Sequence, residues 1–418
     1  MLPHPTPRGW GLAAAGTALV VLGVLLGSVD LVRIGVLAAV LVVGAGAVVA
    51  LTSPGRRRRR LDVRRRVLPN PVHAGETATV TIDVRAVDVG SRVQLTGLRF
   101  AEQAAGELSG GRPLRAHVER AAGHVTVRYT VQAGRRGRWA LGPLVVTRSD
   151  PFGVVRAPST LGSTAEVAVW PAVTALPAPS DVLVGEPDRV ALGARTPSTD
   201  DAALRDYREG DDLRRVHWRS SARRGVLLVR SDERAGMRPV SVLLDQPARP
   251  AAVEWSVSMA ASAALAMLDG GHPVRLVGVS VADETPGEPS SFVHARSGPT
   301  SRAQLLDQLI DITAPRSEAE AEQRLLAGVR MLESSDAGGD LVIAMLGPLS
   351  GPARRALAHV TQTAHGWALV RADSRQPGEA AAAEQTIRAL RRAGWRACRV
   401  TSGEPMVDAW LRLLGNAT

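Results

Sequence analysis

The stretch "PVSVLLDQPARPAAVEWSVSMAASAALAMLDGGHPVRLVGVS" (239–280) decides the fold of the carboxyl-terminal half of the chain. Its first seven residues, 239–245, form a short apolar run that is typical of a buried strand. An apolar helical run follows over 251–269, and a second strand-like run covers 273–280. A strand, a helix and a strand in this order predict a right-handed crossover between two parallel strands.

The same alternation continues to the end of the chain. Strands are predicted over 340–346, 366–372 and 395–401, and helices near 301–313, 317–334, 352–363, 379–393 and 404–414. We therefore expect an α/β domain with a mostly parallel sheet that is covered on both faces. Ligands bind such sheets at the carboxyl ends of the strands, which directs attention to the positions after Leu244, Leu346 and Arg371.

The pattern before this domain is different. Segments 78–87, 124–132 and 141–148 alternate apolar and polar residues with a period of two, and "DPFG" (150–153) has Pro and Gly where a type I turn places them. Several short strands in about a hundred residues indicate an antiparallel β-sandwich of immunoglobulin-like type over 56–175. Residues 176–200, rich in Pro, Gly and polar side chains, are interpreted as a connector to the 201–418 domain.

Two uncharged apolar segments, 10–27 and 34–52, lie at the amino terminus. Each is close to the ~20 residues that a helix needs to cross the hydrocarbon core, so 1–55 is predicted to be a transmembrane helical hairpin. A cleaved signal peptide is the alternative for the first segment. It is disfavoured because no A-x-A site follows and a second apolar segment begins at once.

The arginines next to the second segment indicate its orientation. Arg56–Arg60 and Arg64–Arg66 contribute 8 of the net charge of +11 and leave +3 for the rest of the chain. Positive charge concentrates on the cytoplasmic side, so we expect both termini in the cytoplasm and the eight arginines at anionic lipid headgroups of the plasma membrane. A nucleic-acid partner is not expected, since only 3% of the residues are aromatic and the basic excess is not spread over a folded domain.

Composition excludes several chemistries. The 51 basic residues are all arginines, so a Walker-type phosphate loop, a kinase-like lysine and a Schiff-base lysine are ruled out. The single cysteine, Cys398, lies in a predicted strand with no histidine nearby, which favours a small core residue over a catalytic thiol. We expect no cofactor and no bound metal.

The segment "ALRDYREGDDLRRVHWRSSARRGVLLVR" (203–230) concentrates reactive side chains, with seven arginines and four acids between Arg205 and Arg224. Capping residues predict one helix from Ser198 or Thr199 to Gly210 and a second from Asp211 to about Arg224, with Gly225 at its end. Segment 225–230 is then predicted to be a strand that lies beside 239–245.

Three interpretations of this segment stay open. It is a structural clamp of salt bridges with Trp218 buried, or a docking surface, for which Arg, Tyr and Trp are the usual residues. The third is an enzyme site in which His217 acts as base beside Asp211 or Asp212, with Asp245 at the sheet edge. No G-x-S-x-G, H-E-x-x-H or second nearby His supplies the rest of an active site, so no catalytic residue is assigned.

The long motif resembles the signature of the bacterial domain of unknown function 58 family. The matching positions are Arg205, Tyr207, Gly210, Asp211, Arg214 or Arg215, His217, Trp218, Ser221, Ala222 and Arg223. The resemblance implies a bacterial membrane protein with a hairpin, a β domain and a von Willebrand factor A-like α/β domain. It also implies a neighbouring MoxR-type AAA+ ATPase as a partner, and it brings no established activity.

A magnesium site of the von Willebrand type would need D-x-S-x-S at 245–249. Asp245 occupies the first position, but Pro247 and Arg249 replace the two hydroxyls, which disfavours metal-dependent ligand binding. The sequence thus predicts a membrane-anchored, cytoplasm-facing, non-enzymatic scaffold or adaptor. Its docking surface is expected at Arg205, Tyr207, Gly210, Asp211, Arg215, His217, Trp218, Ser221 and Arg223.

Overall fold

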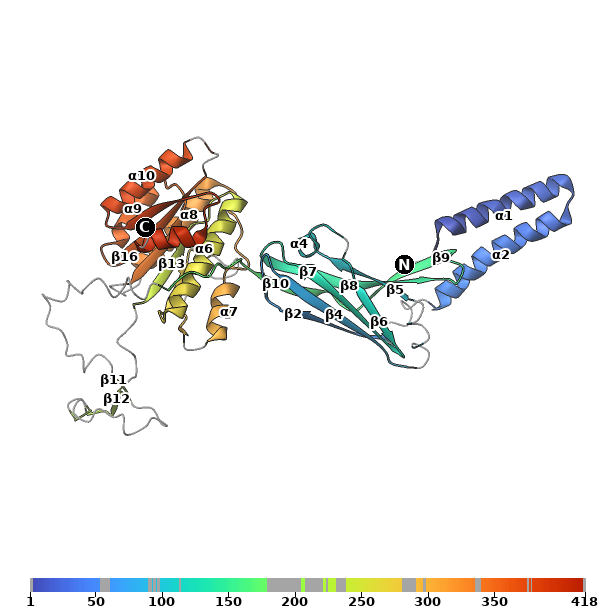
Figure 1. The fold of residues 1–418 in the computed structure, drawn as a ribbon, viewed down its shortest axis with the longest axis horizontal. Helices are drawn as coiled ribbons and strands as arrows, with labels where there is room; N and C mark the ends of the chain where they lie inside the picture. The colour runs from blue at the N-terminus through green and yellow to red at the C-terminus, as the bar shows by residue number, and fades with distance from the viewer. Residues whose placement is uncertain are drawn as a thin grey trace. The chain divides into compact units, whose positions relative to one another are not determined.

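A computed structural model describes most of the chain, with gaps. The described residues are 3–52, 61–88, 92, 95, 98–112, 114–178, 204–206, 221–222, 225–230, 238–279, 291–295, 298–334, 340–373, 376 and 378–415. They divide into two compact units, Met1–Ala172 and Val173–Thr418. Figure 1 shows the helical hairpin and β-sheets of the first unit and the α/β layers of the second.

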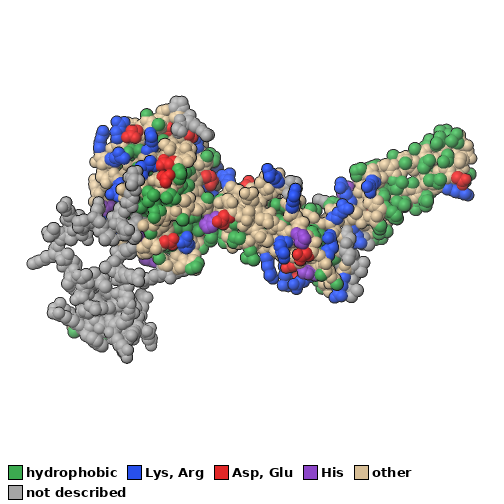
Figure 2. Space-filling view, in the orientation of Figure 1, with side chains coloured by type: hydrophobic (Ala, Val, Ile, Leu, Met, Phe, Trp, Pro, Cys, Tyr) green, Lys and Arg blue, Asp and Glu red, His purple; other side chains and the backbone are tan. Residues whose placement is uncertain are grey.

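The hairpin consists of α1 (Pro7–Leu26) and α2 (Val29–Thr52). Both are long and apolar enough to cross a membrane, with mean hydropathies of 1.5 and 2.7 over their spans. The turn is shorter than expected, because α2 begins at Val29 and carries Asp30 in its first turn, where a carboxylate favours a helix start. Hydrophobic side chains cover most of the visible hairpin surface in Figure 2.

Close packing of α1 on α2 depends on small residues. A Cβ added to Gly35 would lie 2.6 Å from the Gly16 carbonyl oxygen, and one on Gly23 would lie 2.8 Å from Val32. Glycine at these positions lets the two backbones approach, as in other membrane helix pairs. Gly44 and Gly46 have no atom within 4 Å of an added Cβ and so do not form this contact.

The β-sandwich has two sheets. One has the order β1-β9-β8-β10-β3 with β5 also paired to β8, and the other has the order β2-β4-β7-β6. The bounds are β1 (His4–Pro5), β2 (Leu61–Leu68), β3 (Val72–His73), β4 (Thr77–Ala86), β5 (Leu98–Ala104), β6 (His117–Ala121), β7 (His124–Gln132), β8 (Gly137–Ser149), β9 (Val155–Leu161) and β10 (Ala165–Trp170), with the short helix α4 (Gly106–Ser109).

Alternating side chains of the two sheets fill one core. Val80, Ile82 and Val84 of β4 are fully buried, and the intervening positions face outward, as period-two patterning requires. Arg65 is an exception to the apolar–polar alternation of β2, because this charged residue is buried. Its side chain is only 6% exposed and pairs with Glu102 at 2.6 Å. The expectation that Arg65 contacts lipid headgroups is therefore wrong; Arg56–Arg60 lie outside the described residues.

The second unit is built on a parallel sheet of order β14-β13-β15-β16-β17. The strands are β13 (Val240–Leu244), β14 (Val274–Val277), β15 (Leu341–Leu346), β16 (His365–Ala372) and β17 (Arg396–Thr401). The helices are α6 (Pro250–Asp269), α7 (Pro299–Asp307), α8 (Glu318–Glu333), α9 (Gly351–Val360), α10 (Glu379–Arg392) and α11 (Met406–Leu414). An antiparallel bridge of Val293 to Val274 adds to the β14 edge.

The predicted fold class is confirmed: a helical hairpin, an antiparallel β region and a parallel α/β domain follow one another. The α6 helix is also long and apolar enough to cross a membrane, but 78% of its apolar span is buried inside the protein, so it is a core helix.

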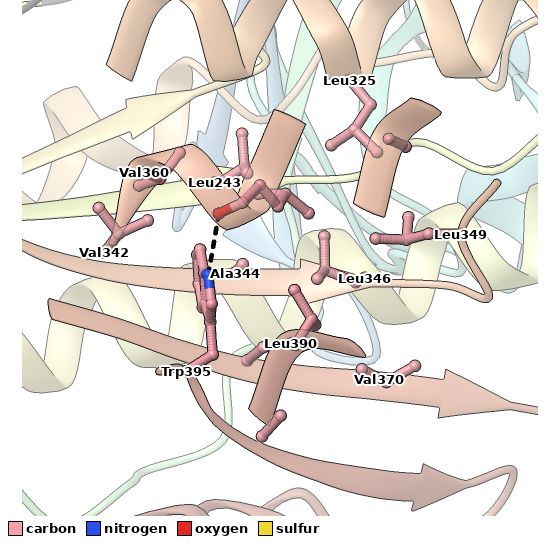
Figure 3. Close-up of a cluster of buried hydrophobic side chains, with 14 of the residues drawn as sticks. Leu243, Leu325, Val342, Ala344, Leu346, Leu349, Val360, Val370, Leu390 and Trp395 are labelled. Carbon is pink, nitrogen blue, oxygen red and sulfur yellow. Dashed lines mark hydrogen bonds between the residues drawn. The ribbon is translucent and has the colours of Figure 1, made fainter. Parts of the chain in front are cut away.

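Figure 3 shows one face of the α/β core, where Leu243, Val342 and Leu390 pack together and Trp395 donates a hydrogen bond to the Leu357 carbonyl. Cys398 is buried in β17, and burial raises the pKa of its thiol, as a core residue requires.

Candidate functional site

The candidate site is a pocket of about 440 Å³ at the carboxyl end of the parallel sheet. The sheet order changes direction between β13 and β15, which is where doubly wound sheets bind ligands. Asp245 follows β13 there and Gly347 follows β15, and both line the pocket. The other charged residues of the lining are Arg249, Glu318, Glu322 and Glu379.

Asp245 is the most buried of these groups, with 7% of its surface exposed. The backbone N–H of Gly347 donates to its Oδ2 at 2.8 Å. Burial raises the pKa of Asp245 to about 6, and the nearby Glu318 carboxylate acts in the same direction. Within the described part of the chain Asp245 forms no ion pair, and no described arginine neutralises its negative charge.

Arg249 lies across one side of the pocket and belongs to a different network. Its Nη2 donates to Glu379 Oε1 at 2.8 Å, and its Nη1 is 4.0 Å from Asp373 Oδ2. The Gln376 amide, oriented to suit both neighbours, accepts from Arg249 at 2.9 Å and donates to Glu379 at 3.2 Å. The hydrogen bond to Glu379 raises the pKa of Arg249, which is thus a fixed cation at the position of the second missing hydroxyl.

Three helices begin at the pocket and position its remaining polar groups. Glu318 is the first residue of α8, and Glu379 is the first residue of α10. Ser350 caps α9 by accepting from the Ala353 N–H at 3.2 Å, and its hydroxyl also donates to Glu322. Carboxylates in a first helical turn are stabilised by the positive end of the helix dipole.

The pocket does not have the ligands of a magnesium site of the von Willebrand type. Pro247 and Arg249 lie in its lining where serine hydroxyls would be required. No group of three His, Cys, Asp or Glu side chains suited to a metal ion occurs among the residues that the structure describes. What the arrangement offers is a partly enclosed, net negative cavity with one buried carboxylate.

The structure describes little of the 203–230 segment. Tyr207, Gly210, Asp211, Arg215, His217, Trp218 and Arg223 lie outside the described residues, as do Asp212 and Arg214, and only the backbone of Arg205 is described. Ser221 is buried, and it and Ala222 are helical. Gly225 follows with a φ of 71° and donates its N–H to the Ser221 carbonyl at 2.9 Å, as expected for the end of a helix.

Two local expectations for this segment are wrong. Leu204–Asp206 form a strand, β11, where a helix was expected, because they pair antiparallel with β12 (Leu228–Arg230). The strand β12 does not lie beside β13, since β14 and β15 already occupy both sides of β13 and leave it no free edge.

Sequence reasoning identified Asp245, Pro247 and Arg249 but missed Glu318, Glu322 and Glu379. A usable signal was present for two of them: Glu318 and Glu379 each open a helix whose start borders the carboxyl end of the sheet. Glu322 gives no such signal, because it lies one turn further along α8 and reaches the pocket only through the packing of that helix.

Comparisons with known proteins do not assign the chain to a family. No protein-family model matches the chain, and no curated protein matches it. The PilB minor pilin from Streptococcus sanguinis is similar over 82% of this chain and 84% of its own, at 10% identity and a TM-score of 0.31. The enterobactin esterase FES from Shigella flexneri is similar over 86% of this chain and 97% of its own, at 12% identity and a TM-score of 0.21.

Proposed function

We propose that the chain is a membrane-anchored, cytoplasm-facing scaffold or adaptor whose α/β domain binds a protein partner at the carboxyl end of its sheet. The observation that carries this proposal is Asp245, a buried carboxylate that faces a pocket and has a backbone N–H as its neutral partner. Burial of an unneutralised carboxylate disfavours the folded state. Groups of this kind concentrate where a ligand supplies the missing interaction.

The charge of the pocket defines the chemistry of the partner. Its lining contains four carboxylates, of Asp245, Glu318, Glu322 and Glu379, and one guanidinium, that of Arg249. Since Arg249 pairs with Glu379, three carboxylates remain for a ligand. We infer that a basic side chain of the partner enters the pocket, and that the 205–223 segment is a second docking surface for the same partner.

The motif resemblance gives the class of partner. A MoxR-type AAA+ ATPase is the partner that the resemblance to the domain of unknown function 58 family implies. The apolar α1–α2 hairpin supports placement of such a complex at the membrane.

The test is a pull-down from native membranes in mild detergent, with the intact chain as bait. Asp245→Asn keeps the shape of the pocket and removes its buried charge, and the matched control Asp408→Asn removes an exposed carboxylate that does not line the pocket. A Tyr207→Ala/Arg215→Ala double variant tests the 205–223 segment. Each variant is first shown to fold by thermal melting.

Recovery of an ATPase by the parent and by Asp408→Asn, with loss for Asp245→Asn, supports docking at the pocket. Loss only for the double variant places docking on the 205–223 segment. Equal recovery by all baits places docking elsewhere, and recovery by none removes the main support for a scaffold.

An enzyme is the second candidate, and one observation favours it. A carboxyl group with a pKa of about 6, such as Asp245, exchanges its proton near neutral pH. The proposed partners in catalysis, Asp211 and His217, lie outside the described residues. A hydrolase screen of the purified chain, with Asp245→Asn as control, would detect such an activity.

A further inference from the structure

Two aromatic side chains are exposed among the residues that the structure describes, and they belong to different parts of the first unit. Trp10 in the first turn of α1 is 65% exposed, and Phe152 in the turn between β8 and β9 is 66% exposed. Every other described Phe, Tyr or Trp is buried or half-buried. An exposed phenyl ring on a turn has no role in the core of the sandwich.

The β8–β9 turn (Asp150–Val154) is internally fixed. The buried Asp150 carboxylate accepts from the N–H of Phe152 at 2.8 Å and from that of Val155 at 2.6 Å. The Gly153 N–H donates to the Asp150 carbonyl at 3.1 Å, which confirms the turn predicted from "DPFG", and Gly153 has a φ of 70°. This bonding holds Phe152 pointing away from the sandwich.

The same turn is bonded to the start of the membrane hairpin. Thr6, which caps α1, donates its N–H to the Val154 carbonyl at 2.8 Å and its hydroxyl to the Gly153 carbonyl at 2.7 Å. A Cβ on Gly9 would lie 2.2 Å from the Val154 oxygen, so α1 contacts the turn directly. The β1 strand pairs with β9, which extends the attachment.

The other helix of the hairpin adds an apolar contact. Val49, in the last turn of α2, packs with Val154, Val155 and Ala157 in one buried cluster. The turn is thus held against both helices at the end of the hairpin opposite to its Asp30–Arg33 apex.

Helix length sets the level of this contact relative to a bilayer. The 24 residues of α2 span about 36 Å at ~1.5 Å per residue, slightly more than the ~30 Å hydrocarbon core. With the charged apex in the far headgroup region, the base of the hairpin lies at the near membrane–water interface. Trp10, Phe152 and the exposed Arg8 and Arg156 lie at this base, and aromatic and arginine side chains are enriched at such interfaces.

We propose that the β8–β9 turn is a membrane-contact site, in which Phe152 inserts into the lipid interface beside the entry of α1 and holds the β-sandwich against the bilayer. The proposal rests on the membrane anchoring proposed above. The occupant is lipid because the ring lies beside the hairpin base and is flanked by arginines that suit phosphate headgroups.

The test places an environment-sensitive fluorophore on single cysteines of the full chain in vesicles of phosphatidylcholine and phosphatidylglycerol. The background is Cys398→Ala, which removes the single native thiol. Phe152→Cys is the test position. Leu68→Cys is the matched control, because Leu68 is exposed to a similar extent, at 70%, but ends β2 at the opposite end of the sandwich. Val40→Cys, at an exposed position in the middle of α2, reports insertion of the hairpin. Thermal melts of the labelled variants confirm that they fold.

Doxyl-labelled lipid should quench the fluorophore at Phe152→Cys, with a blue-shifted emission, and leave that at Leu68→Cys unchanged. Interfacial groups lie about 5–10 Å into the headgroup–acyl boundary, so we expect roughly half of the quenching seen at Val40→Cys in the middle of α2. Quenching at Val40→Cys alone overturns the contact site and leaves the anchor standing, whereas no quenching at either position overturns both. Protection from aqueous iodide in native membranes but not in vesicles would assign Phe152 to a protein partner and overturn the lipid proposal.

Discussion

At the amino-terminal end of the parallel sheet, Arg275 of β14 lies 3.8 Å from Asp340, and both side chains are nearly inaccessible, at 4% and 6% exposure. At the carboxyl end, Asp245 is buried to a similar extent, yet no described arginine neutralises it. Arg275 also donates to the Ser241 hydroxyl at 2.7 Å and lies 4.6 Å from the centre of the Phe292 ring. The same sheet therefore has one buried acid that is paired with an arginine and one that has no arginine partner among the described residues.

This difference separates a structural role from a binding role. Removing one partner of a buried ion pair leaves an uncompensated charge, which destabilises the fold. Removing the charge of a carboxylate that has no cationic partner has the opposite effect. The two ends of the sheet should consequently respond to substitution with opposite signs.

The largest effect is expected for Arg275→Met. This change leaves Asp340 buried without a cation and should lower the free energy of unfolding by about 3–5 kcal/mol at pH 8. Urea unfolding followed by tryptophan fluorescence measures it. The control is Arg302→Met, whose partner Asp269 is half exposed, and which should cost at most about 1 kcal/mol. Similar losses for the two variants would contradict a special role for the buried pair.

Asp245→Asn should raise the free energy of unfolding by about 1–3 kcal/mol at pH 8. Because the pKa of Asp245 is raised from 3.8 to about 6 on folding, the folded state binds this proton more tightly than the unfolded state. The resulting stability is present below pH 3.8 and is lost as the pH rises through about 6, so parent and variant should be equally stable at pH 3.5 and diverge above pH 4. Urea midpoints across this range give the measurement, and a less stable variant at pH 8 would make Asp245 a structural residue.

The smallest effect is expected for Arg249→Ala. Its side chain is 37% exposed, so the pair with Glu379 is screened by solvent and should contribute no more than about 1 kcal/mol. The urea midpoint at pH 8 is again the readout. A loss as large as that of Arg275→Met would show that the carboxyl end of the sheet is held together by ion pairs like the amino-terminal end.

Much of the fold was predictable from sequence because its patterns are long and regular. The uniform apolar runs of α1 and α2 and the buried strands β13 and β15 were placed to within a few residues, except at the start of α2. The 203–230 segment was less predictable. Leu204–Asp206 are too few to show a periodic pattern, and their strand conformation depends on pairing with β12, more than twenty residues further along the chain.

The site was predictable only in part for a related reason. Asp245 and Arg249 lie in the same loop after β13, so their spacing in the sequence was enough to predict that they lie close together. The partner of Arg249, Glu379, lies 130 residues further on and meets it only because β13 and the start of α10 share one edge of the sheet. Neither periodicity nor capping signals predict the pairing of Arg249 with Glu379, because it depends on how each helix packs against the sheet.

The bonds between Thr6 and the β8–β9 turn also impose an order on assembly. Thr6 and Gly153 are 147 residues apart in sequence. At a synthesis rate of about 5–20 residues per second, the turn leaves the ribosome roughly 7–30 s after Thr6. The hairpin thus has an interval in which to enter the bilayer before its base is fastened, and a chain that has not inserted by then would have its first helix bonded to a folded domain while still in water.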